Sequence, residues 1–273
     1  MGMSVLDHTT ALQAGRDIVK AVPAAEGSSR KVLRALLAFS VDTPRHTAES
    51  LAASIGLPLS STYRYLNILK EAALIDEEAR GCFVLAPRVL GLAQAACACA
   101  GTSLVSIARP RLRSLSQQIG ATVMLVRRSG NRAVCLERFD ATSRFQMTFE
   151  VGVALPLHRG AAPKMLLAHL PAAQIEATLD DAVAHDPAFA PHRTALRDEL
   201  VTIRQQGWAE SCAEITPHVV SGAVGIIDDG SVVAAVSFVA PIVQTSKEAQ
   251  TRLMQHLLQA AADITRACNA GAR

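Results

Sequence analysis

Three short segments near the N-terminal end place apolar side chains at the spacing of an amphipathic helix. They are SRKVLRALLAF, AESLAASI and the stretch of residues 60–72. Ser29 and Thr47 stand where N-caps are expected before the first two helices, and Gly56 is expected to end the second. Two short helices joined by a turn that contains glycine form the helix-turn-helix pattern.

A polar interval with a glycine separates two short β-prone runs directly after these helices. The segment ALIDEEARGCFVLA places Arg80 and Gly81 near the tip of an expected hairpin. A hairpin in this position would be a wing. Residues 29–86 therefore predict a winged helix-turn-helix domain, preceded by an arm of residues 1–28 that shows neither helical nor strand periodicity.

The segment PRVLGLAQAACACAG, residues 87–101, is apolar almost all round. A helix with apolar residues on every side needs to be covered on more than one side. This favours a linker helix that packs against its copy in a second subunit, and so predicts a homodimer or a dimer of dimers. An intrachain connector is the alternative.

Residues 102–273 mix strand and helix patterns. A helix is expected from about Leu104 to Ile119, with a kink or a break at Pro110. The runs ATVMLVRR and RAVCLERFD, joined by SGN, are typical of a hairpin, and GAVGIIDDGSVVAAVSFVAP predicts two further strands around a turn. Helical patterns lie between these hairpins and at the end of the chain. Such a mixture predicts an α+β domain.

Composition adds limits to this picture. With 273 residues, a hydrophobic half, a net charge of +3 and a sequence pI near 8.6, the chain suits two domains and permits nucleic-acid binding without requiring it. The six cysteines lack metal-site spacing, so no metal or other cofactor is expected. Without a secretory signal or an apolar run of roughly 20 residues, a soluble cytoplasmic protein with no membrane partner is expected.

The third helix has an unusual polar face. Hydroxyls, phenols, an amide and one guanidinium replace the Glu and Lys residues that usually cover a solvated helix. These groups can bond phosphates or base edges, and Arg64 can form a bidentate contact with guanine. The predicted contacts with double-stranded DNA are Thr47, Ser60, Ser61, Thr62, Tyr63, Arg64, Tyr65, Asn67 and Arg80. A three-helix packing or protein-interaction module is the alternative.

The order of the motifs adds a resemblance. HTAESLAASIGLPLSSTYRYLNIL followed by a wing, then LPLHRGAAPKMLLAHLP and DDGSVVAAVSFVAP, closely resembles the isocitrate-lyase-regulator (IclR) family of bacterial transcription factors over nearly the whole chain from Ser29. The resemblance implies a winged helix-turn-helix that binds operator DNA, a dimerising linker helix, and a C-terminal α/β domain, similar to a GAF fold, that binds a small-molecule effector.

The resemblance also implies where the effector binds. The matching positions are Met147, Leu155, Ala161, Ala162, Ser211, Val219, Ser221, Ser237 and Val239, a mostly apolar set typical of small-ligand sites. The helix start after His158 is expected to offer free backbone N–H groups to a carboxylate. Family members that sense small polar acids tend to carry other residues at Ser211, Ser221 and Val239. A bulkier, less polar ligand, such as an aromatic or alicyclic acid, is therefore expected.

Together these patterns predict a ligand-responsive transcriptional regulator that controls catabolism of a small organic acid, and not an enzyme. Cys135, His158 and Asp140 are residue types found in catalytic sets, but no nucleophile-elbow pattern accompanies them. A histidine beside a structural turn is more typical of a scaffold residue. The alternative is a small-molecule-binding or hydrolase-like protein whose N-terminal module serves only assembly.

Overall fold

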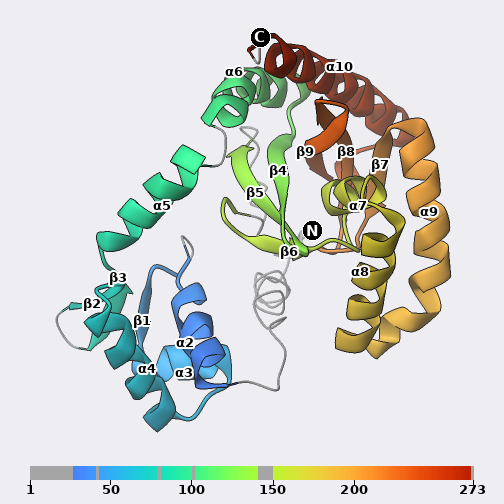
Figure 1. The fold of residues 1–273 in the computed structure, drawn as a ribbon. Helices are drawn as coiled ribbons and strands as arrows, with labels where there is room; N and C mark the ends of the chain where they lie inside the picture. Colours follow the sequence, from blue (N-terminus) through green and yellow to red (C-terminus); the bar gives the residue numbers. More distant parts are fainter. Residues whose placement is uncertain (1–26, 41–42, 79–80, 100–101, 141–149, 272–273) are drawn as a thin grey trace, which may run out of the picture. The chain divides into compact units, whose positions relative to one another are not determined.

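The structure is a computed structural model that describes residues 27–40, 43–78, 81–99, 102–140 and 150–271. The chain divides into two compact units, Met1–Thr102 and Ser103–Arg273 (Figure 1). None of the helices among the described residues combines the length and apolar character needed to cross a membrane. Nearly all of the expected N-terminal arm lies outside the described residues.

The first unit consists of short helices and a small sheet. Its elements are α2 (Ser28–Leu37), β1 (Arg45–Thr47), α3 (Ala48–Ile55), α4 (Leu59–Glu71), β2 (Ile75–Glu78), β3 (Cys82–Leu85) and α5 (Arg88–Cys99). The three strands form an antiparallel sheet in the order β1-β3-β2. Strands β2 and β3 are the expected wing, and α3 and α4 are the expected helix-turn-helix.

Local signals set the ends of these helices. Thr47 caps α3 in a reciprocal box: its hydroxyl oxygen accepts the Ser50 N–H at 3.2 Å, and its own N–H donates to the Ser50 hydroxyl at 2.9 Å. Gly56 ends α3 in the left-handed conformation with φ +65°, which favours glycine. Helix α2 forms where it was expected, but the predicted cap was wrong, because the N-cap is Gly27 and Ser29 lies inside the helix.

The core of the first unit lies where α2, α3 and α4 meet the sheet. Leu51, Leu66 and Leu69 are fully buried there, and Phe83 of β3 packs against them. Strand β1 was not expected, because its segment has no strand pattern. It forms because Arg45–Thr47 pairs with Cys82–Val84 of β3, a contact between distant parts of the chain.

The second unit is built on one antiparallel sheet. Its elements are α6 (Thr102–Ile119), β4 (Thr122–Ser129), β5 (Arg132–Phe139), β6 (Ala154–Pro156), α7 (Ala161–Ala168), α8 (Ala172–His185), a 3₁₀ helix (Pro187–His192), α9 (Arg193–Gln206), β7 (Trp208–Cys212), β8 (Val219–Asp228), β9 (Ser231–Pro241), a 3₁₀ turn (Ile242–Gln244) and α10 (Lys247–Gly271). The strand order is β6-β5-β4-β9-β8-β7. Helix α6 continues through Pro110, so the expected break is not observed. Helices and strands alternate irregularly, which confirms the predicted α+β class.

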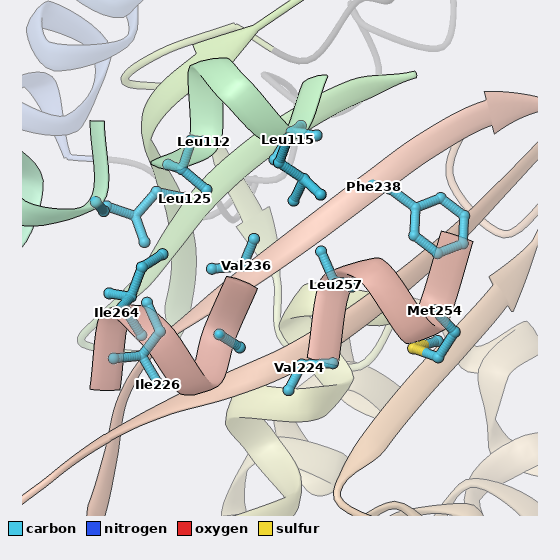
Figure 2. Packing of buried hydrophobic residues seen from close by; sticks show 14 residues of the cluster. Leu112, Leu115, Leu125, Val224, Ile226, Val236, Phe238, Met254, Leu257 and Ile264 are labelled. Carbon is cyan, nitrogen blue, oxygen red and sulfur yellow. The ribbon is translucent and has the colours of Figure 1, made fainter. Parts of the chain in front are cut away.

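Different helices pack on the two faces of this sheet, α6 and α10 on one and α7 on the other. Leu112 and Leu115 of α6 and Leu257 and Ile264 of α10 pack on one face, where Figure 2 shows them close to Leu125, Val236 and Phe238. Neighbouring residues on a strand point to opposite faces. Met124, Ser237 and Val239 therefore point away from this core, toward the face that contacts α7.

Candidate functional site

A cavity lies on the α7 side of the sheet in the second unit. It encloses roughly 480 Å³ of space outside the protein atoms, part of it open to solvent. Its wall consists of Met124, Leu155, Gly160, Ala161, Ala162, Pro163, Ser211, Glu214, Ile215, Thr216, Val219, Ser221, Ser237 and Val239. Most of the wall is apolar, as is usual for small-molecule sites.

The structure brings eight of the nine predicted effector residues to this one wall. They are Leu155, Ala161, Ala162, Ser211, Val219, Ser221, Ser237 and Val239. Met147, the ninth, lies outside the described residues. Ser211 of β7 pairs in register with Ser221 of β8, which in turn pairs with Val239 of β9. Because paired residues share one face of a sheet, these three side chains point to the same side.

Sequence reasoning missed six residues of the wall. Met124 could have been found from its register opposite Ser237, but only once β4 is known to pair with β9. Gly160 and Pro163 flank the expected alanines at the start of α7. The other three, Glu214, Ile215 and Thr216, belong to the loop between β7 and β8 and carried no recognisable signal.

One of the backbone N–H groups expected to be free at the start of α7 is bonded within the protein. The backbone N–H of Gly160, the N-cap residue, donates to Oε2 of Glu214 at 2.9 Å. The other carboxylate oxygen of Glu214 accepts from Nζ of Lys164 at 2.6 Å, and Lys164 also donates to Glu199 at 2.5 Å. Lys164 is only 2% exposed, so two carboxylates compensate its buried charge. A carboxylate of the protein itself thus takes the N–H of the N-cap residue.

His158 has the environment of a scaffold residue. Its ring lies 4.7 Å from that of Phe189, measured between centroids. Burial, together with the nearby charges of Arg159 and Arg132, lowers the pKa of His158 to about 4. The imidazole is therefore neutral and weakly basic near pH 7.

Cys135 and Asp140 do not form a catalytic set with His158. The Cys135 thiol donates to the backbone oxygen of Glu137 at 3.3 Å, and burial raises its pKa to about 12. At neutral pH the thiolate, which would be the nucleophile, is essentially absent. Asp140 instead accepts from Thr122 at 3.1 Å and from Arg138 at 2.8 Å.

The predicted DNA-contacting residues divide into exposed and buried groups on α4. Ser60, Tyr63, Arg64 and Asn67 are exposed, and Ser61 is half-buried. The guanidinium of Arg64 lies 5.2 Å from the centre of the Tyr65 ring and donates to the Tyr65 hydroxyl at 3.2 Å. These polar side chains recur at helical spacing over the first three turns, and Leu59 and Ile68 are exposed on the same helix.

Two of the predicted DNA contacts are corrected by the structure. Thr62 is 0% exposed and its hydroxyl donates to the carbonyl oxygen of Pro58 at 3.1 Å. Tyr65 is 1% exposed and belongs to the core of the first unit. Both residues are three or four positions from Leu66 or Leu69, so they share the buried face of the helix. Their side chains cannot reach a duplex.

The two remaining predicted contacts lie outside α4. Thr47 is exposed, and its hydroxyl oxygen already accepts one bond as the cap of α3. Arg80, at the expected tip of the wing, lies outside the described residues. Among the residues that the structure does describe, no group of three or more His, Cys, Asp or Glu side chains could hold a metal ion.

Comparison with known proteins gives consistent matches. Residues 97–266 match the family model described as the C-terminal domain of the bacterial transcriptional regulator IclR. The HTH-type transcriptional regulator TtgV of Pseudomonas putida is 29% identical over 219 residues, which are 80% of this chain and 82% of TtgV. The repressor AllR of Escherichia coli K12 is 28% identical over 199 residues, 71% of this chain and 73% of AllR.

Solved structures show the same similarity in three dimensions. An IclR homolog from Microbacterium hydrocarbonoxydans, complexed with 4-hydroxybenzoate, superposes with a TM-score of 0.70 at 25% identity, covering 89% of this chain and 100% of that chain. A putative regulator of the same kind from Silicibacter has a TM-score of 0.68 at 25% identity, covering 89% and 96%. The similarity thus includes both sequence and fold.

Proposed function

Because the chain belongs to the IclR family of bacterial transcriptional regulators, we propose that its helix α4 contacts operator DNA and that the cavity beside α7 binds a small organic effector. The relatives are transcriptional regulators and not enzymes, so the predictions of a regulator and of no enzymatic activity are confirmed. The alternative of a hydrolase-like protein with an assembly module finds no support among them. As a regulator of bacterial transcription, the protein is proposed to act in the cytoplasm.

The surface proposed for DNA contact is the exposed face of α4. It leaves out Thr62 and Tyr65, whose side chains are buried. It comprises Ser60, Ser61, Tyr63, Arg64 and Asn67 of α4 and Thr47 at the start of α3. Arg80, expected at the tip of the wing, is proposed in addition. The second helix of a helix-turn-helix enters the major groove with its N-terminal part at the base edges. Support comes from the position of the hydroxyl, amide and guanidinium groups on the first three turns of α4.

Replacing Arg64 by alanine is expected to weaken operator binding by roughly 1–3 kcal/mol, because a charge-assisted contact with a base or phosphate is lost. Fluorescence anisotropy with a labelled operator measures this change. Lys70→Ala is the matched control, since Lys70 lies in the last turn of α4 and pairs with Glu77 of the wing. Equal affinities of wild type and a folded Arg64→Ala variant would remove Arg64 from the interface.

The effector is proposed to be a compound of aromatic ring size, and the regulated genes to serve its catabolism. The observation that supports this is that eight of the nine predicted effector residues line one cavity with mostly apolar walls. One solved relative is a complex with 4-hydroxybenzoate, a compound with a single aromatic ring. Organic acids such as hydroxybenzoates, and neutral compounds with the same ring, are the candidates.

A thermal-shift screen followed by operator titration tests this function. The screen contains 4-hydroxybenzoate, benzoate, benzyl alcohol and 4-hydroxybenzyl alcohol. A compound present at a hundred times its Kd should stabilise the chain by about 2.7 kcal/mol. A compound that stabilises should also change operator affinity, with a coupling of about 1–3 kcal/mol. If ring compounds leave both the unfolding temperature and the operator affinity unchanged, the proposed effector class is wrong.

A further inference from the structure

Tyr65 places a polar group within the core of the first unit. Its side chain is 1% exposed and packs in the cluster that also contains Leu66 and Leu69. A buried phenol brings a hydroxyl group with it, and burying a hydroxyl costs free energy unless the group is hydrogen-bonded. Leu66 and Leu69 fill the neighbouring core positions of α4 without any polar atom. Packing alone therefore does not account for the hydroxyl of Tyr65.

The hydrogen-bond partner of this hydroxyl is the guanidinium of Arg64. Nη2 of Arg64 donates to Oη of Tyr65 at 3.2 Å, and the guanidinium carbon lies 5.2 Å from the centre of the Tyr65 ring. The second distance is that of a cation–π contact. Consecutive residues of a helix do not normally face each other. The Arg64 side chain therefore folds back over its neighbour, and both the ring and the hydroxyl hold it there.

These contacts restrict the guanidinium without using up its donors. Arg64 is exposed, and Ser60 and Asn67 lie one turn before and after it on the same side of α4. A guanidinium carries more N–H groups than the one that Tyr65 engages. A bidentate contact with O6 and N7 of guanine needs a pair of them. Arg64 can thus bind Tyr65 and a base at the same time.

A guanidinium that is held in one pose recognises a base better than a free one. A free arginine side chain loses rotamer freedom when it contacts DNA, and this loss weakens the complex. Arg64 has already lost part of this freedom through its contacts with Tyr65. Its remaining donors also keep a fixed direction. This favours guanine, because guanine presents a matching pair of acceptors in the major groove and the other bases do not.

We propose that Tyr65 is a positioning residue for sequence recognition: its ring and hydroxyl hold the Arg64 guanidinium in the pose that contacts one guanine of the operator. This inference rests on the proposed function, in which the exposed face of α4 contacts operator DNA. Tyr65 acts through Arg64 and does not touch the duplex itself. The chemical group that is recognised is the O6 and N7 edge of a G·C base pair.

The test uses a duplex that the wild-type protein selects from a pool of random sequences. Each guanine is replaced in turn by 7-deazaguanine, which lacks the N7 acceptor and keeps the pairing edge. Wild type should lose about fivefold or more in affinity at one guanine, or at a symmetry-related pair, and Arg64→Ala should lose this sensitivity. Tyr65→Phe keeps the ring and removes the hydroxyl. It should bind the unmodified duplex about threefold to tenfold more weakly and show a smaller penalty at the same guanine.

Tyr63→Phe is the matched control, because it removes a phenolic hydroxyl from an exposed residue of the same helix. Any loss of affinity that it causes should be the same in wild type and in the Arg64→Ala variant. Tyr65→Phe, in contrast, should have no further effect in the Arg64→Ala variant, since the group that it positions is absent. Thermal unfolding shows that each variant is folded at the temperature of the binding assay.

Four results would overturn the proposal. A wild-type protein that is insensitive to 7-deazaguanine at every position contradicts it without the use of any variant. A folded Tyr65→Phe variant with the affinity and the guanine penalty of wild type would show that the hydroxyl does not position Arg64. Tighter binding by this variant would show that the contact with Tyr65 competes with DNA. Equal losses from Tyr65→Phe with and without Arg64 would assign the effect to the core.

The Arg64→Ala variant separates this proposal from the proposed function. If Arg64→Ala weakens operator binding and Tyr65→Phe does not, the DNA-contacting surface of α4 stands and only the role of Tyr65 falls. If a folded Arg64→Ala variant binds the selected duplex as tightly as wild type, Arg64 is not part of the interface, and the role of Tyr65 falls with it.

Discussion

Replacing Ala161 by phenylalanine is expected to abolish effector binding and the effect of the ligand on operator affinity. Ala161 is the buried first residue of α7 and forms part of the cavity wall. A phenyl ring there would fill space that a ring-sized ligand needs. We expect at least a hundredfold loss of affinity, with an overpacking cost of about 1–3 kcal/mol in stability. Operator binding without ligand should stay close to that of wild type.

Calorimetry and anisotropy check this expectation together. The ligand is the ring compound that gives the largest thermal shift with wild type, and unfolding of the variant shows that it is folded. Ala172→Phe is the control, since Ala172 is exposed at the start of α8 and does not line the cavity. If the folded Ala161→Phe variant binds the ligand with wild-type affinity, the effector site lies elsewhere.

A charge at Leu92 is expected to split the proposed dimer and to weaken operator binding at the same time. Leu90 is 66% exposed and Leu92 is 56% exposed on α5, an apolar helix that the described residues of its own unit leave uncovered at these positions. Pairing of two such helices would stabilise the dimer by about 25 cal/mol for each Å² of apolar surface that it removes from water. A glutamate at Leu92 would then be buried without a partner in each copy, which costs several kcal/mol.

Sedimentation across a range of concentrations measures this effect. The Leu92→Glu variant should need at least a hundredfold higher concentration to dimerise. Its operator affinity should fall as well, because a palindromic site is matched by two-fold symmetry of the protein. Gln94→Glu adds the same charge two positions along the helix, where the side chain points to another side. A Leu92→Glu variant that remains dimeric would show that another surface joins the subunits.

The error at Thr62 and Tyr65 shows how residue type and residue position can conflict. Hydroxyl and phenol groups suggested contacts with DNA, whereas the helical period places both residues beside Leu66 and Leu69. The structure buries all four side chains, so position decided the outcome. The helical period of 3.6 residues sets which side chains face the core, whatever their type. A short polar side chain can be buried there when a backbone oxygen accepts its hydrogen bond, as the carbonyl oxygen of Pro58 does for the Thr62 hydroxyl.

The sequence by itself determined what neighbouring residues control. Thr47 and Gly56 mark both ends of α3 because a cap needs only atoms within a few residues. The α+β class also follows from local patterns, because the spacing of apolar residues distinguishes helices from strands. The order of the family's motifs was enough to name eight residues of the cavity wall.

Only the tertiary structure decided which distant groups meet. Strand β1 exists because residues near position 46 pair with residues near position 83, and no local pattern announces that pairing. Glu214 reaches the N–H of Gly160 across 54 positions of the chain, and Lys164 across 50. Such contacts depend on the path of the whole chain, since a carboxylate in a loop looks the same in a sequence whether it faces water or a helix end. The fold therefore decided that a carboxylate of this loop lies in the cavity wall.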